Sequence, residues 1–276
     1  MNNKKEFTKI LVYIFLGLGL VISIYPFYWM LTASTLNEAQ IFKTPPKMIP
    51  AGNFLDNLSM LLDQMPIWNG LFNSLFVSTV TTASIVLLSA LAGYAFSKFH
   101  FKGSKILFAI ILLTMMIPYQ VTIVPLFIIM MKLGWINSYK ALIIPYLVTP
   151  FGVFLMRQQM FAFPEELIES ARVDGCSELG IFFKIVLPNM LPACAALAII
   201  TFLQQWGNFM WPLIVMNTQE KFTMPLMLSM LVAPGQVTKY GPIMVGSVIG
   251  IIPIAILFIF FQKQFVSGMF NGSVKG

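Results

Sequence analysis

The sequence predicts an all-α membrane protein with six transmembrane helices, and three observations support this fold class. Hydrophobic residues make up 58% of the 276 residues and charged residues only 10%, whereas soluble domains carry about 25% charged residues. Apolar windows long enough to cross a bilayer recur six times along the chain. The charged residues lie mostly between those windows. Lipid is therefore the expected solvent for most of the protein surface.

Each predicted span is a charge-poor window of about 20 residues or more. Arg157 interrupts the fourth span near its end, where its long side chain can reach the interface. Several spans contain proline, and kinked helices are tolerated in membranes because neighbouring groups satisfy the freed carbonyls. The six spans are Ile10–Ala33, Gly70–Ser97, Ile106–Met131, Ala141–Phe163, Leu191–Met216 and Gly241–Gln262.

The positive charges indicate the orientation of the chain. Six spans place both termini on one side of the membrane, and eleven of the 17 lysines and arginines fall on that side. Cytoplasmic loops carry an excess of Lys and Arg, so we expect cytoplasmic termini and a cytoplasmic C-terminal tail over residues 263–276. The formal net charge of +7 reflects these flanking residues and not a nucleic-acid site, because no basic stripe is present.

Several function classes lack the residues that they need. The chain has no phosphate-binding loop of the type G-x-x-x-x-G-K-[ST], so it should not hydrolyse ATP itself. Cys176, Cys194 and the lone His100 have no metal-ligand spacing. No acidic residue lies between Asp63 and Glu165, which disfavours a proton-coupled carrier because such carriers use ionisable groups inside the membrane.

The polar segment 164–188 lies on the cytoplasmic side, between spans four and five. Pro164 suits the first position of a helix, and Glu165 and Glu166 would complement the positive end of its dipole. Glu169 and Arg172 are spaced i, i+3, so they could orient one another or meet polar partners in a groove of another protein. The first predicted helix therefore runs from Pro164 to Asp174.

A glycine turn and a second helix follow. Gly175 is free to adopt the positive φ that ends many helices. Ser177 can cap a short helix over Glu178–Leu187, which Pro188 is expected to stop. Two short helices joined by a sharp turn, with an acidic edge and an apolar edge, would fit a groove on another protein.

These residues resemble the EAA loop of ATP-binding-cassette (ABC) importer permeases. The matching elements are Glu169-Ser-Ala171, Asp174-Gly175 and Ile185-Val-Leu187-Pro188, with Ser170 in place of the central alanine. In that family the loop is a coupling helix that docks in a cleft of the ATPase subunit. The resemblance implies that the contacts to the ATPase are made by Glu169, Ser170, Ala171, Arg172, Asp174, Gly175, Leu187 and Pro188.

The resemblance extends over nearly the whole chain. Pro26-Phe-Tyr-Trp-Met30, Tyr94-Ala-Phe96 and Trp206-Gly-Asn-Phe-Met-Trp-Pro212 are similar to the carbohydrate branch, in particular to the second permease of maltose-type transporters. It implies a single transmembrane permease domain over residues 1–276, with the type I ABC importer fold, in the plasma membrane of a bacterium. The implied partners are a homologous second permease subunit in a heterodimer, two ATPase subunits that bind ATP and Mg, and an extracytoplasmic sugar-binding protein. No cofactor is expected in this chain.

A candidate sugar path lies near the fifth span. Gln204, Asn208 and Trp211 are spaced i, i+4 and i+7, so they would share one helical face. Gln205 lies beside them, and Asn73 adds a polar group to the second span. Such groups suit sugar hydroxyls and a pyranose ring. The alternative is that polar groups join helices to one another and that tryptophan anchors a span end at the interface.

The sequence thus predicts the permease subunit of an ATP-driven importer of a sugar, with an oligosaccharide of the raffinose or multiple-sugar type suggested by overall resemblance. The chain would translocate the sugar by alternating access and would not be an enzyme. The alternative is a self-sufficient facilitative sugar carrier or channel, in which segment 164–188 would be only a solvated loop. A membrane enzyme is disfavoured because no metal cluster or nucleophile–base pair is recognisable.

Overall fold

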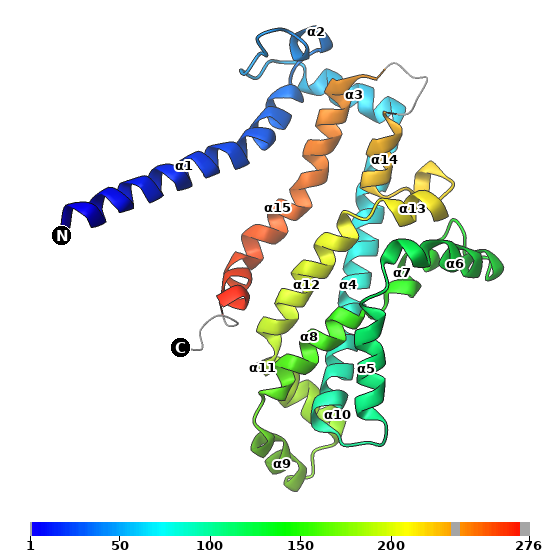
Figure 1. The fold of residues 1–276 in the computed structure, drawn as a ribbon. Helices are drawn as coiled ribbons and strands as arrows, with labels where there is room; N and C mark the ends of the chain where they lie inside the picture. Colours follow the sequence, from blue (N-terminus) through cyan, green and yellow to red (C-terminus); the bar gives the residue numbers. More distant parts are fainter. Residues whose placement is uncertain (1, 233–237, 271–276) are drawn as a thin grey trace. The chain divides into compact units, whose positions relative to one another are not determined.

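The computed structural model describes the backbone of residues 2–232 and 238–270, and within these ranges every regular element is helical (Figure 1). The elements, in chain order, are α1 (Asn2–Ala33), α2 (Glu38–Ile41), α3 (Phe54–Gln64), α4 (Ile67–Lys98), α5 (Ser104–Thr114), α6 (Tyr119–Lys132), α7 (Tyr139–Ile143), η1 (Ile144–Tyr146), α8 (Pro150–Phe161), α9 (Glu165–Val173), α10 (Glu178–Ile181), η2 (Phe182–Val186), α11 (Leu187–Asn189), α12 (Leu191–Trp206), α13 (Met210–Val215), η3 (Gln219–Lys221), α14 (Met224–Met230) and α15 (Tyr240–Phe270).

Four helical stretches are long and apolar enough to cross a membrane: Thr8–Ala33, Ile67–Lys98, Tyr139–Phe161 and Tyr240–Gln262. Two sharply bent helix pairs bring the number of candidate spans to six if each pair crosses as one unit. The predicted all-α membrane fold is confirmed. The first part of the predicted tail 263–276 continues α15 to Phe270, and residues 271–276 lie outside the described ranges.

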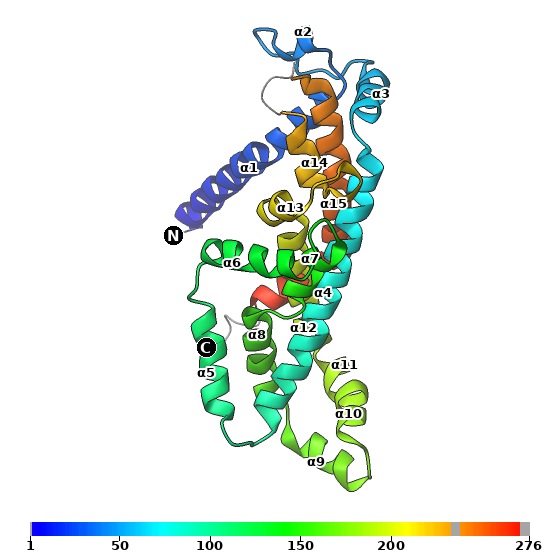
Figure 2. The same cartoon turned by 90° about the vertical axis from the view of Figure 1, so that its right-hand side faces the viewer.

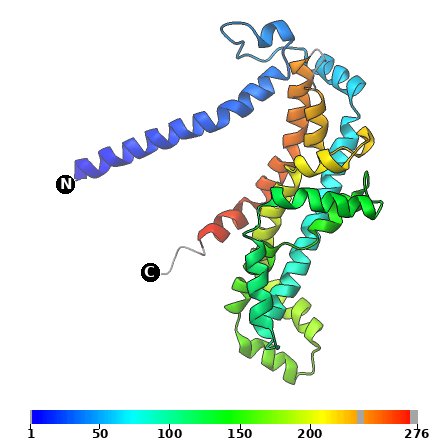
Figure 3. The same cartoon turned by 45° about the vertical axis from the view of Figure 1, so that its right-hand side comes forward.

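The third predicted span is broken. The sequence predicts one helix over Ile106–Met131, but α5 ends at Thr114 and α6 begins at Tyr119, with 101° between the two axes. Figure 3 shows α6 running across the end of α5. Pro118 causes the break because it has no N–H for an intrahelical bond and restricts the residue before it. Its ψ of 132° is extended.

The fifth predicted span, Leu191–Met216, is also interrupted. Helix α12 ends at Trp206, and α13 begins at Met210 after a short break. Pro212 explains the interruption, because a continuous helix would place its ring against the carbonyl of residue 208 and would leave that carbonyl without a partner. Upstream, α12 forms a bent pair with the stretch Glu178–Asn189, at an angle of 77°.

Contacts group the chain into two compact units, residues 1–67 with 227–252 and residues 68–226 with 253–276. In the first unit, Asn57 of α3 is buried and its amide donates to the carbonyls of Ser34 and Leu36, at 2.9 Å each. These bonds hold α3 against the chain that follows α1. The best apolar window of α1 itself contributes no buried residue.

The second unit has a core built from α4, α8, α10 with η2, and α12. Tyr94, Met156, Phe182 and Leu197 belong to it. Helices α4 and α8 pack closely because Gly93 has no side chain, and a Cβ there would lie 2.8 Å from the backbone N of Arg157. Helix α9 lies at the same end of this unit as the C-terminal end of α4 (Figure 2). That the two units act as one transmembrane domain stays a prediction.

Candidate functional site

Helix α9 is an exposed helix held by one narrow apolar edge. It begins at Glu165, one residue later than predicted, because Pro164 occupies the N-cap position with an extended ψ of 131°. Glu165 and Glu166 lie in the first turn, where carboxylates are stabilised by the helix dipole. Only Ile168 and Ala171 are buried. The remaining side chains of α9 are exposed.

A Schellman turn ends α9, as the glycine predicts. Gly175 has φ +79° and its N–H donates to the carbonyl of Arg172 at 3.0 Å. The N–H of Cys176 donates to the carbonyl of Ala171 at 3.0 Å. These two bonds satisfy carbonyls that the end of a helix leaves free. A side chain at residue 175 would meet no neighbouring atom, so the requirement for glycine comes from the backbone conformation alone.

The second helical piece starts as expected and ends differently. Ser177 caps α10 by accepting a hydrogen bond from the N–H of Gly180 at 3.2 Å. The prediction that Pro188 stops the helix is wrong, because Pro188 lies inside the helical run and α11 extends to Asn189. The run passes Pro188 because η2 is a π-helix, in which Leu187 donates to the carbonyl of Phe182. A wider turn shifts the carbonyl that a proline ring would otherwise meet.

Arg172 pairs across the turn with Glu178, and not with Glu169 as the i, i+3 spacing suggests. Its Nε lies 2.7 Å from Oε1 of Glu178, and a second guanidinium nitrogen lies 3.3 Å from Oε2. The hydrogen bond that Arg172 donates to the Glu178 carboxylate raises the pKa of the Arg172 guanidinium. The side chains are 37% and 43% exposed, so we assign the pair at most about 1 kcal/mol of stability. Its effect is to orient α9 against α10.

Two residues of α4 contact this segment or the residue just before it, and sequence reasoning did not find these contacts. The hydroxyl of Tyr94 donates to Oε2 of Glu178 at 3.2 Å. The ammonium of Lys98 donates to the carbonyl of Phe163 at 2.6 Å. Their spacing of i, i+4 puts them on one face, but only the fold shows which segment that face meets.

The exposed surface of segment 164–188 combines apolar and acidic side chains. Val173 is 87% exposed and Leu179 64% exposed, and exposed apolar side chains that gather on one surface mark contacts with a partner or a membrane. Leu167 and Phe183 are exposed as well. The carboxylates of α9, which belong to Glu165, Glu166 and Glu169, lie on the same segment. Such a surface suits burial in a groove with an apolar floor and a polar rim.

The candidate sugar-path residues do not share one helical face. The prediction for Gln204, Asn208 and Trp211 requires a continuous helix, and the break at residues 207–209 separates them. Gln204 is exposed at the end of α12, and Gln205 and Asn208 are half-buried. The correction concerns their geometry, and a role in sugar binding stays a prediction.

Trp211 and Asn73 use their polar atoms within this chain. Trp211 is fully buried, and its indole N–H donates to the carbonyl of Ala141 at 2.9 Å. The amide of Asn73 donates to the carbonyls of Glu220 and Phe222 at 2.8 and 2.9 Å. Its oxygen accepts from the hydroxyl of Tyr139 at 2.6 Å. Asn73 therefore joins α4 to α7, to η3 and to the residue after η3, as the helix-joining alternative predicts.

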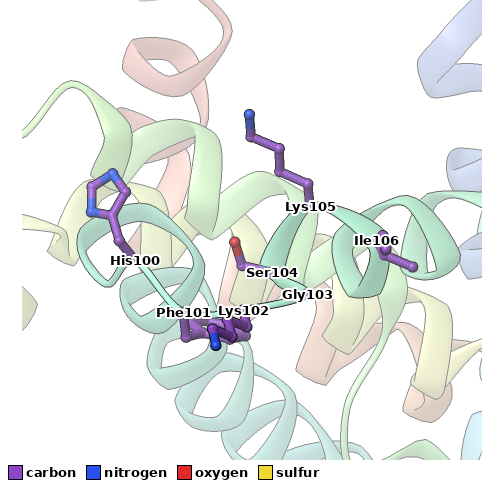
Figure 4. A pocket seen from close by; sticks show the side chains of 7 residues that line it. All are labelled: His100, Phe101, Lys102, Gly103, Ser104, Lys105 and Ile106. Carbon is purple, nitrogen blue, oxygen red and sulfur yellow. The ribbon is translucent and has the colours of Figure 1, made fainter.

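A surface hollow between α4 and α5 is lined by residues 100–106 (Figure 4). The figure shows the polar ends of His100, Lys102 and Lys105 pointing in different directions. They do not converge on a common point, so the hollow offers no ligand cage. Among the residues that the structure describes, no group of three or more His, Cys, Asp or Glu side chains could hold a metal ion.

The fold matches a solved transporter closely. It superposes with a TM-score of 0.84 on a chain from the crystal structure of a bacterial ABC transporter involved in the import of the acidic polysaccharide alginate, at 21% sequence identity and with 95% and 98% of the two chains covered. At this identity the likeness shows the fold. The architecture is therefore that of the type I ABC importer fold.

Sequence comparison gives the family. Residues 85–271 match the family described as binding-protein-dependent transport system inner membrane component, and the chain belongs to this family. It is 39% identical over 258 residues to the arabinooligosaccharides transport system permease protein AraQ of Halalkalibacterium halodurans, with 92% of each chain covered. It is 36% identical to the lactose transport system permease protein LacG of Rhizobium radiobacter, with 99% and 98% covered. Segment 164–188 lies inside the matched range, and its assignment as the EAA loop stays a prediction.

Proposed function

We propose that this chain is a permease subunit of an ATP-driven ABC importer that takes up an oligosaccharide. The relatives named for arabinooligosaccharides and lactose are 39% and 36% identical. Permeases named for sn-glycerol-3-phosphate are 29% identical over 276 residues, so the higher identity favours the oligosaccharide class. A raffinose-type or multiple-sugar substrate remains the expectation from overall resemblance.

The observation that carries this proposal is the exposed α9–Gly175–α10 arrangement. A helix attached by two buried residues, ended by a Schellman turn and followed by a capped second helix, is a rigid projection with an uncovered surface. Rigidity is what a mechanical coupling element needs, because a flexible loop would absorb the displacement. The partner is an ATPase subunit that binds ATP and Mg, so the chemistry is performed there and this chain is not an enzyme.

The proposed assembly contains a homologous second permease subunit, two ATPase subunits and an extracytoplasmic sugar-binding protein. The unburied apolar window of α1 supports contact with lipid or with the second permease. Both termini and segment 164–188 lie in the cytoplasm in this proposal. ATP-driven closure of the ATPase subunits would move α9 and shift the path between the two permeases from inward-open to outward-open.

The sugar path in this proposal runs past the break between α12 and α13. Gln204, Gln205 and Asn208 supply amide groups at this break, and helix ends inside a membrane leave backbone groups free to bind substrate. Trp211 and Asn73 would support the residues that line the path without binding the sugar themselves, because their polar atoms bond within the chain. The second permease can supply the opposite wall.

Purification of the complex from native membranes tests the proposal. We expect two ATPase subunits and a second permease to copurify with this chain, and uptake in proteoliposomes to require ATP and a sugar-loaded binding protein. Uptake by this chain alone, at the same rate without ATP, would instead support the facilitative carrier. Substrate competition with arabinooligosaccharides, lactose and glycerol-3-phosphate then identifies the substrate class.

A further inference from the structure

Two side chains near the C-terminal end of α4 form hydrogen bonds to the chain just before α9 and just after it. On the N-terminal side, the ammonium of Lys98 donates to the carbonyl of Phe163, the residue before Pro164. On the C-terminal side, the hydroxyl of Tyr94 donates to Glu178, and Glu178 in turn binds Arg172 of α9. Both contacts come from one face of one transmembrane helix.

Lys98 is buried and hydrogen-bonded, unlike an ordinary surface lysine. The residue is only 8% exposed, and lysine is almost never buried unless its charge is satisfied. Its ammonium lies 2.6 Å from the Phe163 carbonyl, and hydrogen bonds with a charged donor are among the strong ones. Lys98 therefore fixes the point at which the chain turns from α8 into α9.

The start of α9 has one apolar anchor, the side chain of Phe163, which is 7% exposed and belongs to the same buried cluster as Ile168. The Lys98 bond adds a restraint on the carbonyl of the same residue. A surface hollow opens beside the start of α9, lined among others by Phe163, Pro164, Leu167 and Met190. Within α9 itself, the apolar support comes from Ile168 and Ala171. The Lys98 contact is thus the directional restraint at the N-terminal side of α9.

Tyr94 supplies the matching restraint at the other side. Its ring packs against Phe99 with centroids 5.4 Å apart and against Phe182 with centroids 5.5 Å apart. The residue is 4% exposed and belongs to the same buried cluster as Ile168. Its hydroxyl reaches Glu178 beyond the turn. Apolar contacts can slide because they are not directional, whereas hydrogen bonds depend on angle and distance.

We propose that Tyr94 and Lys98 form a clamp through which α9 moves α4. This inference rests on the proposed function, since it assumes that ATPase subunits displace α9. With both sides of α9 bonded to one turn of α4, a displacement of α9 shifts the cytoplasmic end of α4 with it. Tyr94 and Lys98 are positioning residues, because they act through Phe163, Glu178 and Arg172 and touch neither ATP nor sugar.

The test measures coupling and not only activity. The complete transporter is reconstituted in proteoliposomes with loaded binding protein, and sugar imported per ATP hydrolysed is compared between variants. In Lys98→Met and in Tyr94→Phe this ratio should fall at least about threefold, with ATPase subunits still copurifying at wild-type levels. Lys98→Arg should restore it because a guanidinium can also donate to the Phe163 carbonyl. Lys102→Met, at an exposed lysine four residues further on, is the matched control.

A double-substitution cycle makes the test specific for the clamp. Tyr94→Phe combined with Glu178→Ala should lower the ratio no further than the more damaging of the two alone, because each substitution removes the Tyr94–Glu178 hydrogen bond. Tyr94→Phe keeps the aromatic ring, so it remains informative if Lys98→Met fails to assemble.

Two results would overturn the clamp. An unchanged ratio in Tyr94→Phe would show that α9 moves without this contact. Loss of the ATPase subunits from the variants would show that the end of α4 serves docking and not transmission. Failure of the proposed function looks different, because wild-type protein would then import sugar without ATP before any variant is compared.

Discussion

Arg172 and Glu178 lie on opposite sides of the Gly175 turn and are joined by a 2.7 Å contact between Nε and Oε1. The same carboxylate accepts from Tyr94, so one side chain connects α9, α10 and α4. The pair is too exposed to contribute much global stability. Its expected effect is local, on the angle between the two helical pieces.

Glu178→Gln should therefore loosen the turn without unfolding the protein. We expect amide hydrogen exchange at Gly175 and Cys176 to become at least about threefold faster, because local opening then costs less free energy. Glu165→Gln, on the same segment but away from the turn, serves as the control. Equal exchange rates in the two variants would show that the Schellman bonds alone hold the turn.

Cys176 provides a native probe of both orientation and docking. It is exposed, whereas Cys194 is buried. In intact cells an impermeant maleimide should leave Cys176 unlabelled, and a permeant one should label it in permease that lacks ATPase subunits. Bound ATPase subunits should slow this labelling at least about tenfold, because docked surface is removed from water. Rapid labelling from outside would contradict the cytoplasmic placement of segment 164–188.

We expect Asn73 to contribute mainly to the stability of the fold. Asn73→Ala removes three hydrogen bonds and leaves partners unsatisfied in a buried place, so we expect a loss of about 2 kcal/mol or more. The melting temperature of the purified permease measures this loss, with Asn69→Ala at an exposed position as the control. A variant with unchanged melting temperature but weaker sugar uptake would instead make Asn73 a direct sugar contact.

Asn208 offers the better test of the sugar path, because it is half-buried at the break between α12 and α13. Asn208→Ala should raise the KM for uptake about two- to tenfold, the range expected for one lost hydrogen bond. Assembly with the ATPase subunits should persist. Gln219→Ala, at an exposed position in η3, is the control, and a wild-type KM for Asn208→Ala would remove this residue from the path.

Local chemistry made part of the structure predictable. The apolar windows, the carboxylates in the first turn of α9, the cap at Ser177 and the positive φ of Gly175 each depend on a few adjacent residues. The breaks at Pro118 and before Pro212 were misjudged because proline in a membrane helix can kink it or end it, and neighbouring helices decide which.

Long-range contacts were not predictable from one sequence. The i, i+3 spacing makes Glu169 the nearest partner for Arg172, but the turn brings Glu178 closer and better aligned. Lys98 resembles an ordinary interfacial lysine at a span end, and only the path of the chain from α8 to α9 puts the Phe163 carbonyl beside it. Likewise, the separation of Gln204 from Trp211 follows from the break and not from their spacing.

The most direct test of the central claim is a comparison of Gly175→Asp with Gly175→Asn. Glycine at φ +79° can be replaced by asparagine or aspartate at small cost, because both side chains tolerate this backbone conformation. Aspartate differs by its negative charge, which the dipole disfavours just after the C-terminal end of α9. Copurified ATPase subunits and ATP hydrolysis, with and without loaded binding protein, are measured for both. The account predicts that Gly175→Asp inserts normally but loses ATPase binding or sugar-stimulated hydrolysis, while Gly175→Asn stays close to wild type. Normal values of both quantities in Gly175→Asp would contradict the assignment of segment 164–188 as the coupling element.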